Sequence, residues 1–218
     1  MIYLVWLLVF VPLGVVGAIA FSVYSTIQKL DDARLVPMDP NQNPRCSGVA
    51  TKYGTWAHKR GMNFEGCYAI DGPVPMMIVA WQSFQPVAYF VVYLVPEDKS
   101  YFEFVSVISE QLGATLTTTT SIDAFVLPSP DDCYKQCFSR ATPEQLLKHH
   151  VAAQQYLNQT RRIGFVPPRQ SLPQSILISI KSQLKFVRSK PLYPLRAVWW
   201  YFVTRNSSDN KSVQQQES

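Results

Sequence analysis

Residues 76–95 read MMIVAWQSFQPVAYFVVYLV, and this stretch decides the fold class. Two apolar runs rich in β-branched and aromatic residues, at 76–82 and 87–95, flank the polar segment 83–86, which contains a proline. Such runs separated by a turn signal predict two adjacent β-strands. The whole uncharged stretch 72–96 could instead be read as a second membrane span, but its polar centre disfavours that reading.

The pattern of short strands continues towards the C-terminus. The turn-like segment 96–100 precedes a run of Val, Phe and Tyr at 101–108, and Gly113 marks the next turn. Two further strands are expected at 114–120 and 122–127. Because the connections are short, the strands are predicted to form an antiparallel meander.

The clearest helix signal begins at Thr142. An N-cap threonine, a proline at the first helical position and Gln145 three residues after the cap predict a helix from 143 to about 159. Its apolar residues fall on one face, which is expected to cover the meander. The α+β domain is therefore assigned to residues 58–160.

The N-terminal residues 1–28 contain no charged side chain. A hydrocarbon core of roughly 30 Å requires about 20 apolar residues in a helix, so this segment predicts a transmembrane anchor. A cleaved signal peptide and a buried soluble helix are the alternatives. Lys29 and Arg34 follow the segment and favour a single-pass membrane protein with a cytoplasmic domain. Residues 29–57, rich in proline, are interpreted as a linker.

The C-terminal stretch 161–205 contains nine basic residues and no acidic one. Residues 171–190 have apolar positions at near-helical spacing, which predicts a basic amphipathic helix, and 196–205 is aromatic. The predicted partner is the lipid bilayer with its anionic headgroups, while a protein partner stays open and nucleic acid is less favoured. The tail 206–218 is predicted to be disordered. The candidate membrane-surface residues are Lys181, Lys185, Arg188, Lys190, Trp199 and Trp200.

Motifs for catalysis are missing from the sequence. There is no nucleophile elbow, dinucleotide fingerprint or Walker loop, so an enzyme is the less favoured reading and no cofactor is predicted. Cys133, Cys137 and His149 are weak candidates for a zinc site, because their spacing is not the usual one. His150 lies on the apolar face of its helix and is expected to be packed, with one hydrogen bond.

Two short motifs carry a resemblance to a known group. Residues 113–118 read GATLTT and residues 147–150 read LKHH. With these two motifs in this order along the sequence, the chain resembles uncharacterised single-pass bacterial membrane proteins with a small strand-rich domain. The resemblance implies the architecture and no activity.

The combined prediction is an α+β chain. An N-terminal transmembrane helix is followed by a small antiparallel β-meander packed by one helix, and then by a basic amphipathic segment. The predicted function is a membrane-anchored accessory or protein-interaction domain. The alternatives are a metal-dependent enzyme using Cys133 and Cys137 with a nearby histidine, or a secreted or lumenal domain with disulfide bonds.

Overall fold

A computed structural model gives the fold of the chain. It describes residues 2–71, 75–96, 99–125, 127–167, 169–205 and 209–217. In the first helix, α1 (Ile2–Asp31), side chains are described from Gly17 onwards. Among the helices so described, none is both long and apolar enough to cross a membrane.

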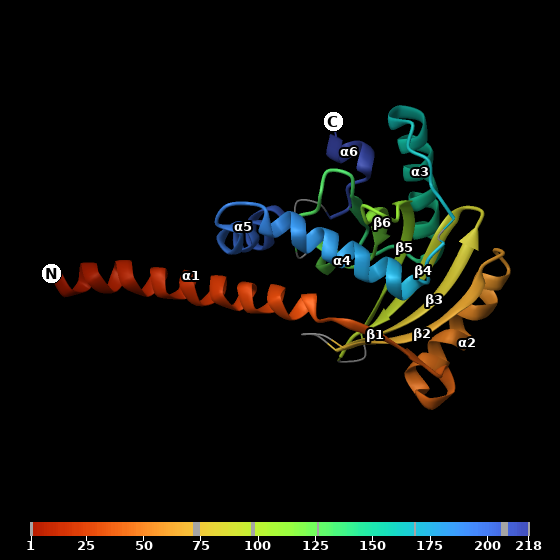
Figure 1. Cartoon of the computed structure of the whole chain (residues 1–218), viewed down its shortest axis with the longest axis horizontal. Coiled ribbons are helices and arrows are strands. Elements are labelled where there is room, and N and C mark those ends of the chain that lie inside the picture. The colour runs from red at the N-terminus through yellow and green to blue at the C-terminus, as the bar shows by residue number, and fades with distance from the viewer. Residues whose placement is uncertain are drawn as a thin grey trace.

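A seven-stranded sheet forms the centre of the molecule (Figure 1). The strands follow one another in chain order, and every neighbouring pair is antiparallel except β6 and β7, which are parallel. This confirms the predicted α+β class and antiparallel meander. The strands are β1 (Arg34–Met38), β2 (Asn63–Asp71), β3 (Met76–Phe84), β4 (Val87–Leu94), β5 (Ser100–Ser109), β6 (Ala114–Thr119) and β7 (Tyr134–Cys137).

The stretch that opened the sequence analysis forms the hairpin β3–β4. Met77 pairs with Leu94 and Phe84 with Val87, so a two-residue turn joins the strands. The interpretation of 72–96 as two strands is thereby confirmed for the described residues, and residues 72–74 lie outside them. Both faces of β3 and β4 are buried, which explains why the run is apolar without polar alternation.

Two local predictions differ from the structure. The stretch interpreted as an irregular linker holds β1, the 3-10 turn η1 (Pro40–Gln42) and helix α2 (Pro44–His58). The Asn43 side chain caps α2 by accepting hydrogen bonds from the backbone N–H groups of Arg45 and Cys46. Asparagine is a common N-cap residue, so the sequence contains a signal for the start of this helix. The expected strand at 122–127 is a 3-10 helix, η2 (Ile122–Phe125).

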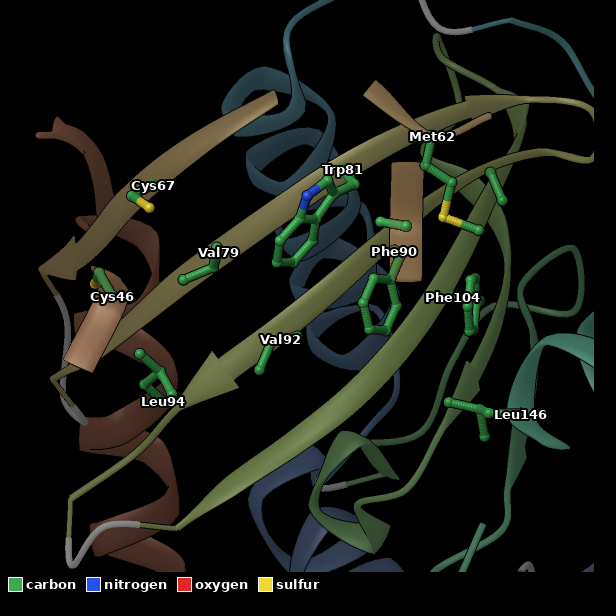
Figure 2. Packing of buried hydrophobic residues seen from close by; sticks show 12 residues of the cluster. Cys46, Met62, Cys67, Val79, Trp81, Phe90, Val92, Leu94, Phe104 and Leu146 are labelled. Atoms are coloured by element: carbon green, nitrogen blue, oxygen red, sulfur yellow. The ribbon is translucent and has the colours of Figure 1, made fainter. Parts of the chain in front are cut away.

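The first face of the sheet is covered by two helices rather than by one. Helix α3 (Pro143–Arg161) has the predicted capping box between Thr142 and Gln145, and it packs on this face together with α2. Their shared apolar cluster is centred on Phe90, whose ring stacks on Trp81 and Phe104 (Figure 2). This face is the main apolar core.

The second face is covered by α4 (Leu172–Arg188), the helix predicted at 171–190. Figure 1 shows α4 lying across the sheet, with the C-terminal part of α1 beside it. Leu172 packs on a cluster with Ile78 and Tyr89, whereas Leu184 packs on Ile27 of α1. The apolar stripe of α4 is therefore used inside the protein.

Gly113 allows α4 to approach the turn between β5 and β6 closely. Its φ of +68° is a left-handed conformation, and a Cβ there would lie 3.0 Å from the Ser182 Cβ and 3.1 Å from the Ile178 carbonyl oxygen. Glycine alone meets both conditions without strain. The residue that begins the 113–118 motif thus fixes the position of α4.

The C-terminal residues form three short helical elements: α5 (Tyr193–Trp199), the π-helical turn η3 (Trp200–Thr204) and α6 (Val213–Glu217). Helix α5 lies beside α1. The tail differs from the prediction of disorder within residues 209–217, because Val213 is buried and its N–H donates to the Gln136 side chain. Residues 206–208 and 218 lie outside the described part of the chain.

Candidate functional site

A cavity of about 370 Å³ lies between the second face of the sheet and α4, with the end of α1 at its border. Ligand pockets usually measure about 300–1,000 Å³ and have mostly apolar walls with a few polar groups. Most lining side chains are apolar here too, among them Val91, Val105, Val107, Ile176 and Ile180. The size and lining are those of a small-molecule site.

Helix α4 packs on the protein through two separate apolar clusters. Leu172 sits in one apolar cluster and Leu184 in another. Between them, Ser175 and Ser179 line the cavity with short side chains. Small residues at these positions leave the space between helix and sheet unfilled.

Glu103 of β5 is the most unusual residue of the cavity wall. Its side chain is 8% exposed and comes from the middle of a strand between Phe102 and Phe104. The hydroxyl of Tyr93 donates a hydrogen bond of 3.2 Å to its Oε1 atom. Burial raises the pKa of Glu103 to about 7, although Lys135 and the Tyr93 hydrogen bond act in the opposite direction. A buried carboxyl group at a cavity is a marker of a functional site.

Lys135 of β7 brings a positive charge to the same cavity. Burial lowers the pKa of its ammonium group, and the negative charge of Glu103 opposes that shift. The two residues come from strands separated by β6, and both line the cavity. Glu103 and Lys135 therefore place opposite charges on one wall.

Ser175 adds a polar group without a partner. Its Oγ atom is buried, and no hydrogen-bond partner is present among the described residues. Most buried polar atoms in proteins are hydrogen-bonded, and leaving one unsatisfied costs about 1–3 kcal/mol. Its position on the cavity wall makes it available to a bound molecule.

His150 lies on the opposite face and is fully buried, as the sequence predicted. It makes two hydrogen bonds rather than one, with Ser106 Oγ at 2.7 Å and Thr118 Oγ1 at 2.8 Å. The Ser106 hydroxyl donates to the Val87 carbonyl, so His150 Nε2–H donates to Ser106 and Nδ1 accepts from Thr118. Burial lowers the pKa of His150 to about 3. This neutral, satisfied imidazole has a structural role.

The metal candidates are separated by the strand that carries them. Cys133 immediately precedes β7 and Cys137 ends it, and residues four apart on a strand lie about 13 Å apart. One zinc ion binds thiolates at about 2.3 Å, so it cannot bind both. His149 is exposed and stacks on Phe138. Within the described residues, no group of three metal-ligating side chains is present.

The cysteines are all free thiols in the structure. The separation along β7 also prevents a bond between Cys133 and Cys137, because a disulfide needs Cα atoms within about 7 Å. Cys46 of α2 and Cys67 of β2 are both buried in the apolar core of the first face (Figure 2). Burial raises the pKa of Cys67 to about 12, which makes a reactive thiolate unfavourable.

The predicted membrane-surface residues fall into two groups. Arg188 is held by an ion pair with Asp31 and donates to the Ile27 carbonyl at the end of α1. Trp200 is half-buried. The remaining four, Lys181, Lys185, Lys190 and Trp199, are exposed. Arg188 thus joins α4 to α1 instead of presenting a free charge.

The polar cavity residues Glu103, Lys135 and Ser175 are not among the site residues predicted from the sequence. A signal for Glu103 exists, since it is a single carboxylate between two phenylalanines in an otherwise uncharged strand. Lys135 is likewise the single charged residue of a short strand, between Tyr134 and Gln136. Ser175 has no such signal, because a serine in an amphipathic helix is ordinary.

Comparison with known proteins adds nothing to these observations: no family model, no curated protein and no solved structure matches the chain.

Proposed function

We propose that the chain is a membrane-tethered accessory domain that rests a C-terminal apolar surface on the bilayer. This surface consists of exposed apolar side chains of α5, η3 and the residue that precedes them. Large exposed apolar patches commonly mark interaction sites. The C-terminal apolar surface comprises Leu192, Leu195, Trp199, Phe202 and Val203.

The observation that carries the proposal is the position of this surface beside α1. The ring of Tyr193 in α5 lies 6.3 Å from that of Tyr24 in α1, and Ala197 shares a buried cluster with Ile27. Phe21 of α1 is 72% exposed. Tyrosine and tryptophan side chains collect at membrane interfaces, which fits this end of α1.

The length of α1 before it meets the domain supports the tether. Among the described side chains, Val23 is the first of α1 in the apolar cluster with α4 and α5. The preceding residues 2–22 carry no charge. At 1.5 Å per residue they would extend about 31 Å, close to the hydrocarbon thickness of roughly 30 Å.

Exposed basic residues in and after α4 favour anionic headgroups as partners. Lys181 and Lys185 lie on the outer side of α4, and Lys190 follows that helix. Each basic residue near an anionic leaflet contributes roughly 1 kcal/mol. Lys29 and Arg34, directly after the uncharged segment, favour a cytoplasmic location of the domain.

The tether is tested by alkaline extraction of membranes from cells that express the full chain. We expect the protein to remain in the membrane pellet. Val15→Arg places a charge in the centre of the uncharged segment. The free-energy cost of inserting this charge into the membrane is about 2.5–3.5 kcal/mol, so the variant should show reduced retention. Gln28→Arg, at the end of the segment, is the matched control and should not. Full extraction of the unmodified protein would overturn the tether.

The surface contact is tested by quenching tryptophan fluorescence with brominated lipids in vesicles that contain the full chain. Trp199→Phe should reduce the quenched fraction, because this side chain is expected to enter the interface. Trp56→Phe removes a tryptophan of α2 on the opposite side of the sheet and serves as control. Equal quenching in the two variants would contradict the membrane contact of Trp199.

A further inference from the structure

The cavity beneath α4 has a feature that separates it from a packing defect. An apolar void in a protein core is normally lined by apolar atoms alone. This cavity has a buried carboxyl group, an ammonium group and an unpartnered hydroxyl on its walls, from Glu103, Lys135 and Ser175. Such polar groups in an apolar pocket fix the orientation of a ligand.

The charges on the wall restrict the kind of ligand. Above pH 7, Glu103 and Lys135 carry opposite charges and act on each other electrostatically. Asp123, which also lines the cavity, is paired with Arg205. A third charge brought by a ligand would be removed from water without a free counter-charge, which is strongly unfavourable. A hydroxyl group, in contrast, can donate to a carboxylate and accept from a serine.

The geometry points to binding of a small neutral alcohol with a compact hydrocarbon body. The apolar side chains of β4, β5 and α4 would surround the hydrocarbon part. The alcohol group would hydrogen-bond to polar side chains of the wall, with Ser175 on the α4 side. This inference goes beyond the proposed tether and does not depend on it, since the cavity lies between the sheet and α4.

Three matched probes test the ligand class. Cyclohexylmethanol, cyclohexanecarboxylate and cyclohexylmethylammonium share one hydrocarbon ring and differ in charge. Binding to the purified full chain at pH 8 is followed by saturation-transfer NMR and by the shift in Tm. We expect saturable binding of the alcohol, with the two ions at least about tenfold weaker, which corresponds to about 1.4 kcal/mol. Equal binding of all three, or no binding of the alcohol, overturns the inference.

Two substitutions in α4 locate the site. Ser179 lines the cavity, so Ser179→Leu should fill part of it and reduce affinity for cyclohexylmethanol by about tenfold or more. Gln174 is exposed on the same helix, and Gln174→Leu should leave affinity unchanged. A circular dichroism spectrum and Tm show that each variant is folded. Equal affinity in the two variants would place the ligand elsewhere.

A third substitution separates hydrogen bonding from occupied volume. Ser175→Ala removes the unpartnered hydroxyl and little else. We expect a three- to tenfold loss of affinity for cyclohexylmethanol, about the contribution of one hydrogen bond, and no loss for methylcyclohexane. An unchanged affinity for the alcohol would contradict the role of Ser175. Because the cavity lies within the folded domain and the binding assay contains no lipid, failure of the tether would leave these results intact.

Discussion

The two faces of the sheet differ in the surroundings of their buried titratable side chains. On the first face, His150 is surrounded by Ser106 and Thr118, and every hydrogen-bonding atom of its ring has a partner. On the second face, Glu103 borders a cavity and Ser175 has an unpartnered hydroxyl. Burial of a titratable side chain is therefore common to both faces, but of these two side chains only Glu103 borders a cavity.

This contrast explains why His150 is structural and Glu103 is a candidate for function. A closed hydrogen-bond network stabilises one arrangement and leaves no position for a ligand. A buried carboxyl group beside a cavity keeps hydrogen-bonding capacity that a bound molecule can use. The distinction depends on the surroundings of each residue rather than on its type.

The largest effect should come from removing apolar volume on the first face. Phe90 is fully buried between aromatic rings, so Phe90→Ala should lower the free energy of unfolding by about 3–5 kcal/mol. Ile176 borders the cavity on the second face, and Ile176→Ala should cost only about 1–2 kcal/mol because part of its surface has no packing partner. Urea denaturation of the full chain measures both. Equal losses would remove the proposed difference in packing.

Disrupting the closed network is expected to have the next largest effect. His150→Phe keeps an aromatic ring but leaves Thr118 without its acceptor, which should cost about 1–3 kcal/mol. Below pH 6.5 the unfolded chain takes up a proton that folded His150, with its pKa lowered to about 3, does not. The contribution of His150 to the unfolding free energy should therefore fall with decreasing pH, by up to about 1.4 kcal/mol per pH unit. Because Glu103 acts in the opposite direction, the contribution of His150 is measured as the difference between the unmodified protein and His150→Phe.

His150→Phe should lose the contribution of His150 to the pH dependence. Denaturation between about pH 4 and pH 7, a range that includes the unperturbed histidine pKa, measures this loss. His149→Phe alters the exposed neighbour and should retain it. Identical pH profiles for the unmodified protein and His150→Phe would refute the neutral imidazole.

The second face should show the opposite pH dependence. Burial raises the pKa of Glu103 to about 7, so the folded state holds a proton that the unfolded state has released. This contribution to stability is present below about pH 4.5 and disappears as the pH rises through 7. Glu103→Gln should remove this decline, which is measured as the difference in unfolding free energy between the unmodified protein and the variant, because His150 acts in the opposite direction. Asp71→Asn changes an exposed carboxylate of β2 as control, and it should leave the decline in place.

The smallest effect concerns the close contact between Gly113 and α4 on the second face. Gly113 and Gly61 both have positive φ angles, but only Gly113 has the backbone of a helix within contact distance of a Cβ. Each Gly→Ala change should cost about 1–2 kcal/mol for the left-handed conformation. Gly113→Ala should lower the unfolding free energy by more than Gly61→Ala does. This difference, determined by denaturation, measures the close approach of α4. A larger loss at Gly61 would contradict that contact.

Local signals in the sequence predicted the elements well where the stabilising contacts lie close along the chain. The capping box of α3 joins residues three apart, and the strands of the β3–β4 hairpin follow each other directly. The N-cap of α2 at Asn43 was equally local but was obscured by neighbouring prolines. The prediction of a strand at 122–127 was wrong because its apolar residues fit either a strand or a helical turn.

What the sequence alone determined is that residues 171–190 form a helix with one apolar stripe and a basic remainder. What only the tertiary structure decided is where that stripe lies: on the sheet, with Arg188 paired to Asp31 and a cavity beside Glu103. The physical reason is that the hydrophobic effect is non-directional. A pattern shows that a surface must be covered, and contacts between residues far apart in the chain decide what covers it.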